Sequence, residues 1–304
     1  MPEDQSYEGS EWNRQMCNLL KFFKWEYVGD SDFDAPTEEN KQRGIDRLFT
    51  FKNPYRGEKE LCILESKRYK KTSFSEGKIG EWAKTLEEKL TKIRHSKEFY
   101  ELFPHLDGMS FDQGLVAIWC PDKELVTGFN QVFLKGLENT DLNPKHSKSM
   151  NKLYFFDNNK ISKLVSVAHT VKEINTGGLK RDFNFYYHGN KDYASCRSEV
   201  LLPMYMIGKF ILGDYIDKDN VENKVVFYFG TLNIPSFKLL RSALSDLSYT
   251  DKDKPLQIYY SIEDNNHTFR KILPEIEKDY NDLNVKFLPL DSFDKIPAFL
   301  NTDN

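Results

Sequence analysis

The chain reads Gly44-Ile45-Asp46-Arg47-Leu48-Phe49-Thr50-Phe51 and then, after a turn at residues 53–57, Leu61-Cys62-Ile63-Leu64-Glu65-Ser66-Lys67. Both stretches are rich in β-branched, aromatic and other apolar residues, and the turn between them contains Asn, Pro and Gly. This pattern predicts two antiparallel strands joined by a hairpin loop longer than two residues.

Three charged residues of this hairpin lie where a sheet tolerates charge poorly. Asp46 opens the first predicted strand, and Glu65 and Lys67 directly follow four apolar residues of the second. Side chains alternate along a strand, so Glu65 and Lys67 point to one face and Ser66 points to the other. An acid and a base two residues apart, beside an acid on the neighbouring strand, predict a compact site that binds a metal and activates water.

The overall composition limits the possible classes. The chain has 304 residues, which favours two domains, and its formal charge of -4 with a pI near 6.0 gives no global positive field for nucleic acid. The charge is uneven, however. Residues 51–100 hold 13 Lys and Arg against 8 Asp and Glu, a net charge of +5, whereas residues 1–50 carry 6 against 11, a net charge of -5. The basic segment is the one that contains Glu65 and Lys67.

The cysteines indicate a reducing compartment. Cys17, Cys62, Cys120 and Cys196 are far apart and form no Cys-x-x-Cys or Cys/His pattern, so the sequence predicts buried thiols rather than disulfides or zinc. The six histidines are also scattered, without ligand spacing. Because no leader-like N-terminus and no membrane-spanning apolar run is present, we expect a soluble cytoplasmic protein with no membrane partner.

Residues 1–165 are predicted to form a small α/β domain with one mixed sheet. Apolar spacing predicts a helix over residues 10–24, with Ser10 as its N-cap and Glu11 in its first turn. A polar loop is expected over residues 29–43. The other expected elements are a short strand at 25–28, a long amphipathic helix at 78–100, strands at 114–119 and 153–156, and a helix at 123–137. The outer face of the long helix is expected to carry Lys84, Lys89, Lys92, Arg94 and Lys97, either as a solvated surface or for a polyanion.

Residues 166–304 are predicted to form a second, Rossmann-like α/β domain, because the composition changes near residues 160–180 and residues 175–178 resemble a junction. Strands are expected at 183–187, 225–229, 256–262 and 285–288, alternating with helices at 197–212, 235–247 and 268–280. Pro235 suits the first turn of the second of these helices. No glycine-rich nucleotide motif is present, so this domain is expected to serve in target recognition, regulation, oligomerisation or docking of a partner.

The arrangement of these residues resembles the PD-(D/E)XK nuclease superfamily, in the style of its restriction-endonuclease-like and Mrr-like members. The resemblance rests on Glu11 in an N-terminal helix, Gly-Ile-Asp at residues 44–46 and Glu65-Ser66-Lys67 at a strand end, and it covers residues 7–120, extending to about 160. Gly-Ile replaces the Pro that names the motif. The resemblance implies a restriction-endonuclease-like fold and a Mg²⁺-dependent DNA endonuclease of restriction or anti-phage defence that also accepts Mn²⁺.

Each residue then has an expected role. Asp46 and Glu65 offer hard oxygen ligands for Mg²⁺, and the resemblance adds the backbone carbonyl of Ser66. Lys67 is placed to orient or deprotonate the attacking water. Glu11 would reach the site from its helix, as a second-metal ligand or through a water. The candidates for nucleic-acid contact are Arg68, Lys70, Lys71 and Lys84.

Competing interpretations remain open from the sequence. The three central charges could form a strand-end salt bridge, and Glu11 could simply complement the helix dipole. The chain could be a catalytically inert nucleic-acid-binding or protein-interaction module, or it could act on RNA or on specialised DNA ends. The modest charge also favours a partner subunit, a homo-oligomer or both, which would supply part of the DNA surface.

Overall fold

The computed structural model describes residues 7–30, 32–39, 41–122, 126–140, 151–261, 266–293 and 300. The chain divides into two compact units, each described here by itself. The first unit comprises residues 1–53, 57–162 and 294–304, and the second comprises residues 54–56 and 163–293. In the described parts of the chain, no helix combines the length and the hydropathy that crossing a bilayer requires.

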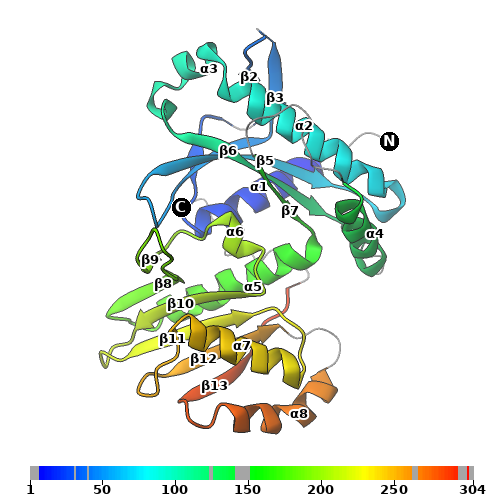
Figure 1. Ribbon diagram of the computed structural model, residues 1–304. Coiled ribbons are helices and arrows are strands. Elements are labelled where there is room, and N and C mark those ends of the chain that lie inside the picture. Colours follow the sequence, from blue (N-terminus) through cyan, green and yellow to red (C-terminus); the bar gives the residue numbers. More distant parts are fainter. Residues whose placement is uncertain are drawn as a thin grey trace. The chain divides into compact units, whose positions relative to one another are not determined.

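The first unit is built on a mixed five-stranded sheet in the order β1-β4-β5-β6-β7 (Figure 1). Strands β1, β4 and β5 pair antiparallel, whereas β5, β6 and β7 pair parallel. The sheet strands are β1 (Glu26–Val28), β4 (Arg47–Lys52), β5 (Lys59–Arg68), β6 (Ser110–Trp119) and β7 (Lys152–Phe156). The helices are α1 (Tyr7–Phe22), α2 (Glu76–Arg94), α3 (Lys97–Leu102), α4 (Val126–Glu138) and α5 (Asn158–Asn175), the last of which continues into the second unit. The unit also contains two 3₁₀ turns, η1 (Lys71–Ser73) and η2 (Pro104–Leu106).

The prediction of a mixed α/β architecture with helices flanking the sheet is confirmed for this unit, including the hairpin of β4 and β5. Two local predictions were wrong. Residues 29–43 are not a plain loop, because they contain most of a separate antiparallel hairpin, β2 (Phe33–Pro36) and β3 (Gln42–Ile45), whose Ala35 and Ile45 are buried in the core. The single helix predicted over 78–100 is two helices, because the hydroxyl of Ser96 caps a new one by accepting the backbone N–H of Phe99 at 3.2 Å.

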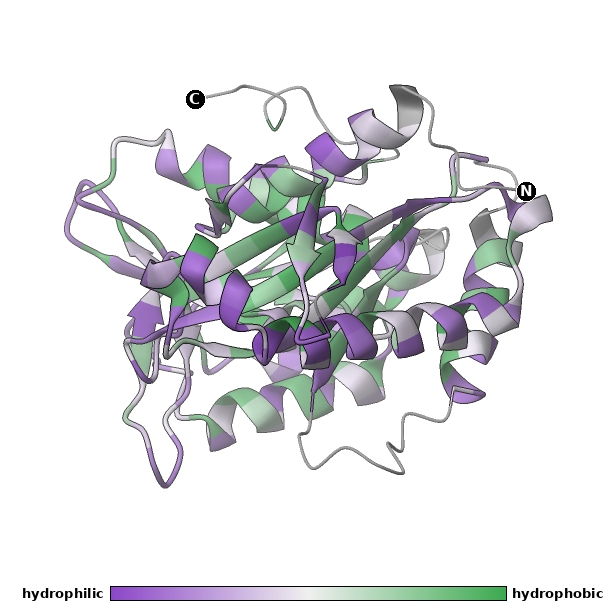
Figure 2. Cartoon of the chain, turned by 90° about the horizontal axis from the view of Figure 1, so that it is seen from above, coloured by the Kyte–Doolittle hydropathy of each residue, from purple (hydrophilic) through white to green (hydrophobic). Residues whose placement is uncertain are grey.

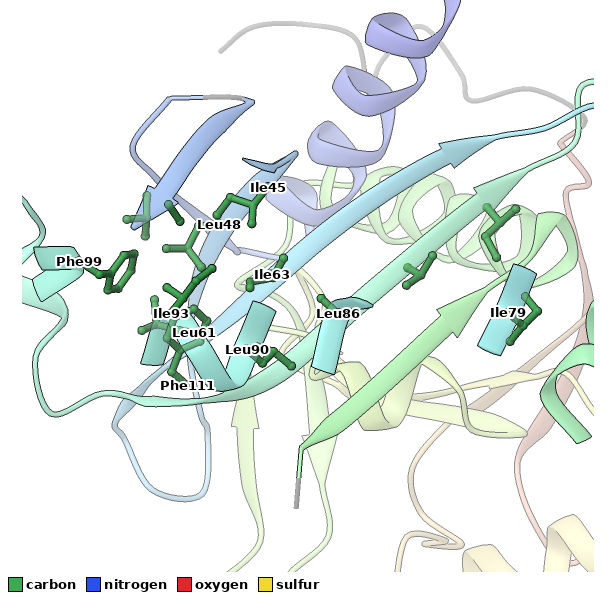
Figure 3. Packing of buried hydrophobic residues seen from close by; sticks show 14 of the residues in the cluster. Ile45, Leu48, Leu61, Ile63, Ile79, Leu86, Leu90, Ile93, Phe99 and Phe111 are labelled. Atoms are coloured by element: carbon green, nitrogen blue, oxygen red, sulfur yellow. The ribbon is translucent and has the colours of Figure 1, made fainter. Parts of the chain in front are cut away.

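Helix α2 covers one face of the sheet through an apolar stripe. Leu86, Leu90 and Ile93 are buried in the same cluster as Leu61 and Ile63 of β5, and Figure 3 shows these side chains pointing toward one another. In Figure 2 the hydrophobic colour concentrates in the strands, whereas the helices alternate between hydrophobic and hydrophilic residues. Odd-numbered residues of β5 therefore face α2.

Helix α1 contacts the sheet through the opposite face. Its apolar residues Trp12, Met16, Leu19 and Leu20 are buried, and the indole N–H of Trp12 donates to the carbonyl of Ala117 on β6 at 3.3 Å. Alternation along β5 then directs even-numbered residues toward α1. The helix already includes Tyr7, so the prediction that Ser10 is its N-cap was wrong, and Glu11 is not in the first turn.

The second unit contains a six-stranded sheet in the order β13-β12-β11-β10-β8-β9. Its strands are β8 (Arg181–Tyr187), β9 (Cys196–Ser198), β10 (Phe210–Ile216), β11 (Glu222–Tyr228), β12 (Leu256–Ser261) and β13 (Val285–Leu290). Its other helices are α6 (Pro203–Met206), α7 (Ile234–Asp246) and α8 (Asn266–Asp279).

The prediction of a regular parallel sheet in this unit was wrong. Strands β11, β12 and β13 are parallel, but β8, β9 and β10 join through antiparallel pairings. The helix predicted over 197–212 is also absent from these described residues, which form β9, the short α6 and the start of the central strand β10. Pro235 does lie in the first turn of α7, as predicted, and Asn233 caps that helix by accepting the N–H of Ser236 at 2.9 Å.

Candidate functional site

The register of β4 and β5 leaves one side of the end of β5, the middle strand of the sheet, without a neighbouring strand. The last residues that pair are Arg47 of β4 and Leu64 of β5, so β5 continues beyond the beginning of β4. On the other side, β5 stays paired with β6, with Glu65 opposite Val116 and Lys67 opposite Ile118. The end of β5 therefore has a strand on one side and an open position on the other, where side chains can approach its backbone.

Asp46 occupies this open position. It lies between β3 and β4, and its Oδ2 accepts the backbone N–H of Ser66 at 2.6 Å. In a strand, the N–H and the C=O of one residue point to the same side, so that both can bond to the same neighbouring strand. The carbonyl of Ser66 consequently points to the edge of β5 that Asp46 approaches.

Glu65 and Lys67 share the face of β5 that α2 covers. The Lys67 Nζ lies 3.2 Å from Glu65 Oε2 and 3.8 Å from Asp46 Oδ2. The side chains of Glu65, Lys67 and Asp46 are 8%, 11% and 25% exposed. The structure thus brings together the three charged residues singled out from the sequence, in a cluster that is mostly withdrawn from solvent.

Lys89 of α2 is a further member of this cluster that the sequence analysis assigned to the wrong face. Its Nζ lies 2.5 Å from Glu65 Oε1, and its side chain is 13% exposed. The long aliphatic stem lets a lysine at the margin of an apolar stripe direct its ammonium inward. The signal that could have found it is Glu65 itself, because a buried carboxylate requires a positive or hydrogen-bonding partner.

The side chain of Ser66 points away from this cluster, as the alternation predicted. Its hydroxyl donates to Asn13 Oδ1 of α1 at 3.1 Å. Asn13 Oδ1 also lies 3.5 Å from the thiol of Cys17, whose pKa burial raises to about 11. The bond between Ser66 and Asn13 joins α1 to the end of β5. The Cys17 thiol stays protonated at neutral pH.

Glu11 lies on α1 and is held by neighbours on its own helix. Its carboxylate accepts bonds from Arg14, with a shortest distance of 2.7 Å, and from the amide of Gln15 at 3.0 Å. Its side chain is 30% exposed. A role for Glu11 in the site stays a prediction, and the helix-dipole interpretation loses its basis because the helix begins before Ser10.

The four basic residues expected to contact nucleic acid have different surroundings. Lys70 precedes η1 and Lys84 projects from α2, and both are exposed. Arg68 ends β5 and Lys71 begins η1, and both are partly buried. Their contact with a phosphate backbone stays a prediction.

The donor set at the open edge fits a hard divalent cation. Asp46 and Glu65 supply carboxylate oxygens, and the Ser66 carbonyl supplies a neutral oxygen, which together are the ligand types that Mg²⁺ prefers. Lys67 and Lys89 balance the charge of the two carboxylates.

A second group of possible ligands lies in the other unit. His169 Nδ1 is 3.7 Å from Glu173 Oε2, one turn along α5, and 3.4 Å from Asp291 Oδ2, just after β13. The two carboxylates are 63% and 64% exposed. The sequence analysis missed this group, although the four-residue separation of His169 and Glu173 was visible.

The comparison with protein families matches residues 1–160 to the model described as GAPS4 protein PD-(D/E)XK nuclease domain. The match includes the whole described candidate site of the first unit. Neither the curated proteins nor the solved structures gave a significant match.

Proposed function

The chain belongs to the family of the GAPS4 protein PD-(D/E)XK nuclease domain, and on that premise we propose that it is a Mg²⁺-dependent endonuclease that hydrolyses DNA phosphodiester bonds. The observation that carries the proposal is the meeting of Asp46, Glu65 and Lys67 beyond the beginning of β4. Mn²⁺ is expected to replace Mg²⁺, because it accepts the same oxygen ligands.

The residues divide the chemical work. Asp46, Glu65 and the Ser66 carbonyl would hold the cation. When bound, the cation would stabilise the negative charge that develops on the phosphate and lower the pKa of a coordinated water. Lys67 lies beside both carboxylates, so its ammonium can orient the attacking water and balance the charge of the transition state.

DNA is the proposed substrate because Glu65, Ser66 and Lys67 lie in the most basic part of the chain. Residues 51–100 carry a net charge of +5, and Arg68, Lys70, Lys71 and Lys84 belong to this segment. Cationic side chains around the site would hold the phosphate backbone without reading its sequence. Glu11 is the proposed fourth acidic residue, and it would act through a water or a second cation after release from Arg14.

We also propose a biological setting, which the family and the charge support. We place the enzyme in the cytoplasm, in restriction or anti-phage defence. Because the whole chain carries a formal charge of -4, we expect weak DNA binding by the isolated chain. A partner subunit or a second copy would then complete the DNA surface, with the second unit serving in recognition, regulation or assembly.

Plasmid cleavage tests the proposal directly. Native protein with Mg²⁺ should nick or linearise plasmid, and Glu65→Ala and Lys67→Ala should lower the rate by at least about a hundredfold, because general acid–base and electrostatic groups contribute at that scale. The matched controls are Glu81→Ala and Lys78→Ala, which remove an exposed acid and base paired at 2.7 Å on α2.

The controls should cut at the native rate. Equal cleavage by native protein and both site variants would refute the assignment of the site. If the native chain cuts no DNA, with or without a purified partner, yet still binds it, the inert binding module becomes the better description.

A further inference from the structure

Glu65 has an ammonium partner on each of its two carboxylate oxygens. Lys67 approaches Oε2 at 3.2 Å from the same strand, and Lys89 approaches Oε1 at 2.5 Å from α2. The three side chains are between 8% and 13% exposed. Two cations therefore already pair with the carboxylate that is expected to bind a third.

The two lysines differ in what else they contact. Lys67 also lies 3.8 Å from Asp46 Oδ2, so it bridges both acidic residues from the strand that carries Glu65. Lys89 comes from a different element, and its ion pair is with Glu65. A carboxylate oxygen can accept more than one partner, but a divalent cation and an ammonium on the same oxygen repel each other strongly in a site with little water.

We propose that Lys89 is a positioning residue that holds Glu65 as a counter-ion and competes with the divalent cation for it. Binding of the cation requires the Lys89 ammonium to leave Glu65 Oε1, whereas Lys67 keeps its place between the two acids. Lys89 thereby keeps the charged site neutralised in the metal-free protein and raises the cation concentration at which the site fills. This inference rests on the proposed function of Asp46 and Glu65 as metal ligands.

Packing keeps Lys89 in reach of Glu65. Lys89 lies between Leu86 and Leu90 in the sequence of α2, and both leucines are buried against the sheet (Figure 3). The helix therefore cannot rotate away without exposing that core, and release of Glu65 is a movement of the flexible lysine side chain alone. An ammonium on a long flexible stem suits such an exchange.

Calorimetric titration with Mn²⁺, without nucleic acid, tests the competition. Lys89→Met removes the ammonium and keeps the apolar stem, so we expect it to bind Mn²⁺ at least about threefold more tightly than the native protein, because the cation no longer has to break the ion pair between Lys89 and Glu65. Lys89→Arg keeps the charge and should retain an affinity close to the native one. The control Lys78→Met breaks a Lys–Glu pair of similar length elsewhere on α2 and should leave the affinity unchanged.

Thermal unfolding of each variant checks that it folds, and Lys89→Gln replaces Lys89→Met if the latter does not, because the amide still donates to Glu65 without a charge. Unchanged or weaker Mn²⁺ binding by the folded neutral variant would overturn the inference and make Lys89 a structural anchor of Glu65. Failure of the proposed function looks different. In that case the native protein either does not bind Mn²⁺ or binds it as well as Glu65→Ala does, and both proposals are refuted together.

Discussion

Asp46 combines a structural contact with a proposed chemical one. Its Oδ2 accepts the Ser66 N–H at 2.6 Å, which completes the edge of β5 where β4 no longer reaches, and the same oxygen lies 3.8 Å from Lys67. A neutral amide can replace the first contact because its carbonyl is also an acceptor. It cannot replace the charge.

We therefore expect Asp46→Asn to separate the two roles. The variant should fold with a midpoint of thermal unfolding near the native one, while its affinity for Mn²⁺ in calorimetric titration falls about tenfold or more, because affinity for hard cations follows the number of charged ligands. Asp107→Asn, which changes an exposed aspartate of the same unit, should alter neither property. Native Mn²⁺ affinity in Asp46→Asn would exclude Asp46 as a ligand.

At this scale the sequence indicated how the hairpin residues point, and it missed the contacts that Lys89 and Asn13 make with them. Alternation along one strand is a local property, so it correctly separated Glu65 and Lys67 from the Ser66 side chain. The contacts of Lys89 and Asn13 depend on how α2 and α1 are rotated against the sheet. That rotation is decided by packing, which a single sequence does not display.

Among the elements, α2 depends on a glycine of the sheet beneath it. A Cβ on Gly114 of β6 would lie 2.6 Å from Leu86 Cδ2, so the helix sits at its present depth because residue 114 has no side chain. Leu86 is one turn from Lys89 on the same helix. The depth of α2 thus bears on both the stability of the core and the reach of Lys89 toward Glu65.

Gly114→Ala should destabilise the protein by about 1 to 3 kcal/mol, as overpacking of a filled core does. The control Gly77→Ala changes a glycine in the first turn of α2 that has open space around it, and it should not destabilise the protein. Urea unfolding measures both free energies. Leu86→Ala should relieve part of the cost of Gly114→Ala in the double variant, and strict additivity of the two changes would contradict the proposed clash.

Elements were predictable where their pattern is strongly periodic. The apolar stripe of α2 is of this kind, and the hairpin of β4 and β5 was predictable from two apolar runs that flank a turn with Asn, Pro and Gly. The run Val200 to Leu212 is almost uniformly apolar, which periodicity cannot assign to helix or strand. In the structure its end enters β10, a strand paired on both sides by β8 and β11, where burial of both faces removes the alternation.

For the whole molecule, the sequence analysis placed a domain boundary at residue 165, and the chain divides into compact units between residues 162 and 163, inside α5. A helix that continues from one unit to the next leaves no loop or linker composition to mark the boundary. The second unit also includes residues 54–56 of the β4–β5 turn, where the hydroxyls of Tyr55 and Tyr205 lie 2.6 Å apart. Contact between residues so distant in sequence leaves no local signal. The sequence therefore could not show that residues 54–56 belong to the second unit.

The net charge of the whole chain bears on how its affinity for DNA depends on salt concentration. Because the whole chain is negatively charged and few basic residues are expected to contact DNA, binding should be weak. The logarithm of the association constant should fall linearly with the logarithm of the salt concentration, with a slope of about -0.9 for each phosphate contact. If Arg68, Lys70, Lys71 and Lys84 are the contacts, the slope for the isolated chain should be no steeper than about -4. Lys70→Ala combined with Lys84→Ala should make it shallower by about 2.

Fluorescence anisotropy of a labelled duplex measures this slope, with EDTA present to prevent cleavage. The matched control combines Lys218→Ala with Lys286→Ala, which removes two exposed lysines of the second unit and so changes the net charge equally. An equal change in slope for both pairs would show that net charge, rather than local contact, governs binding, and would remove Lys70 and Lys84 from the DNA surface. A slope that steepens when a partner subunit or a second copy is added would mean that the partner supplies phosphate contacts, as we propose.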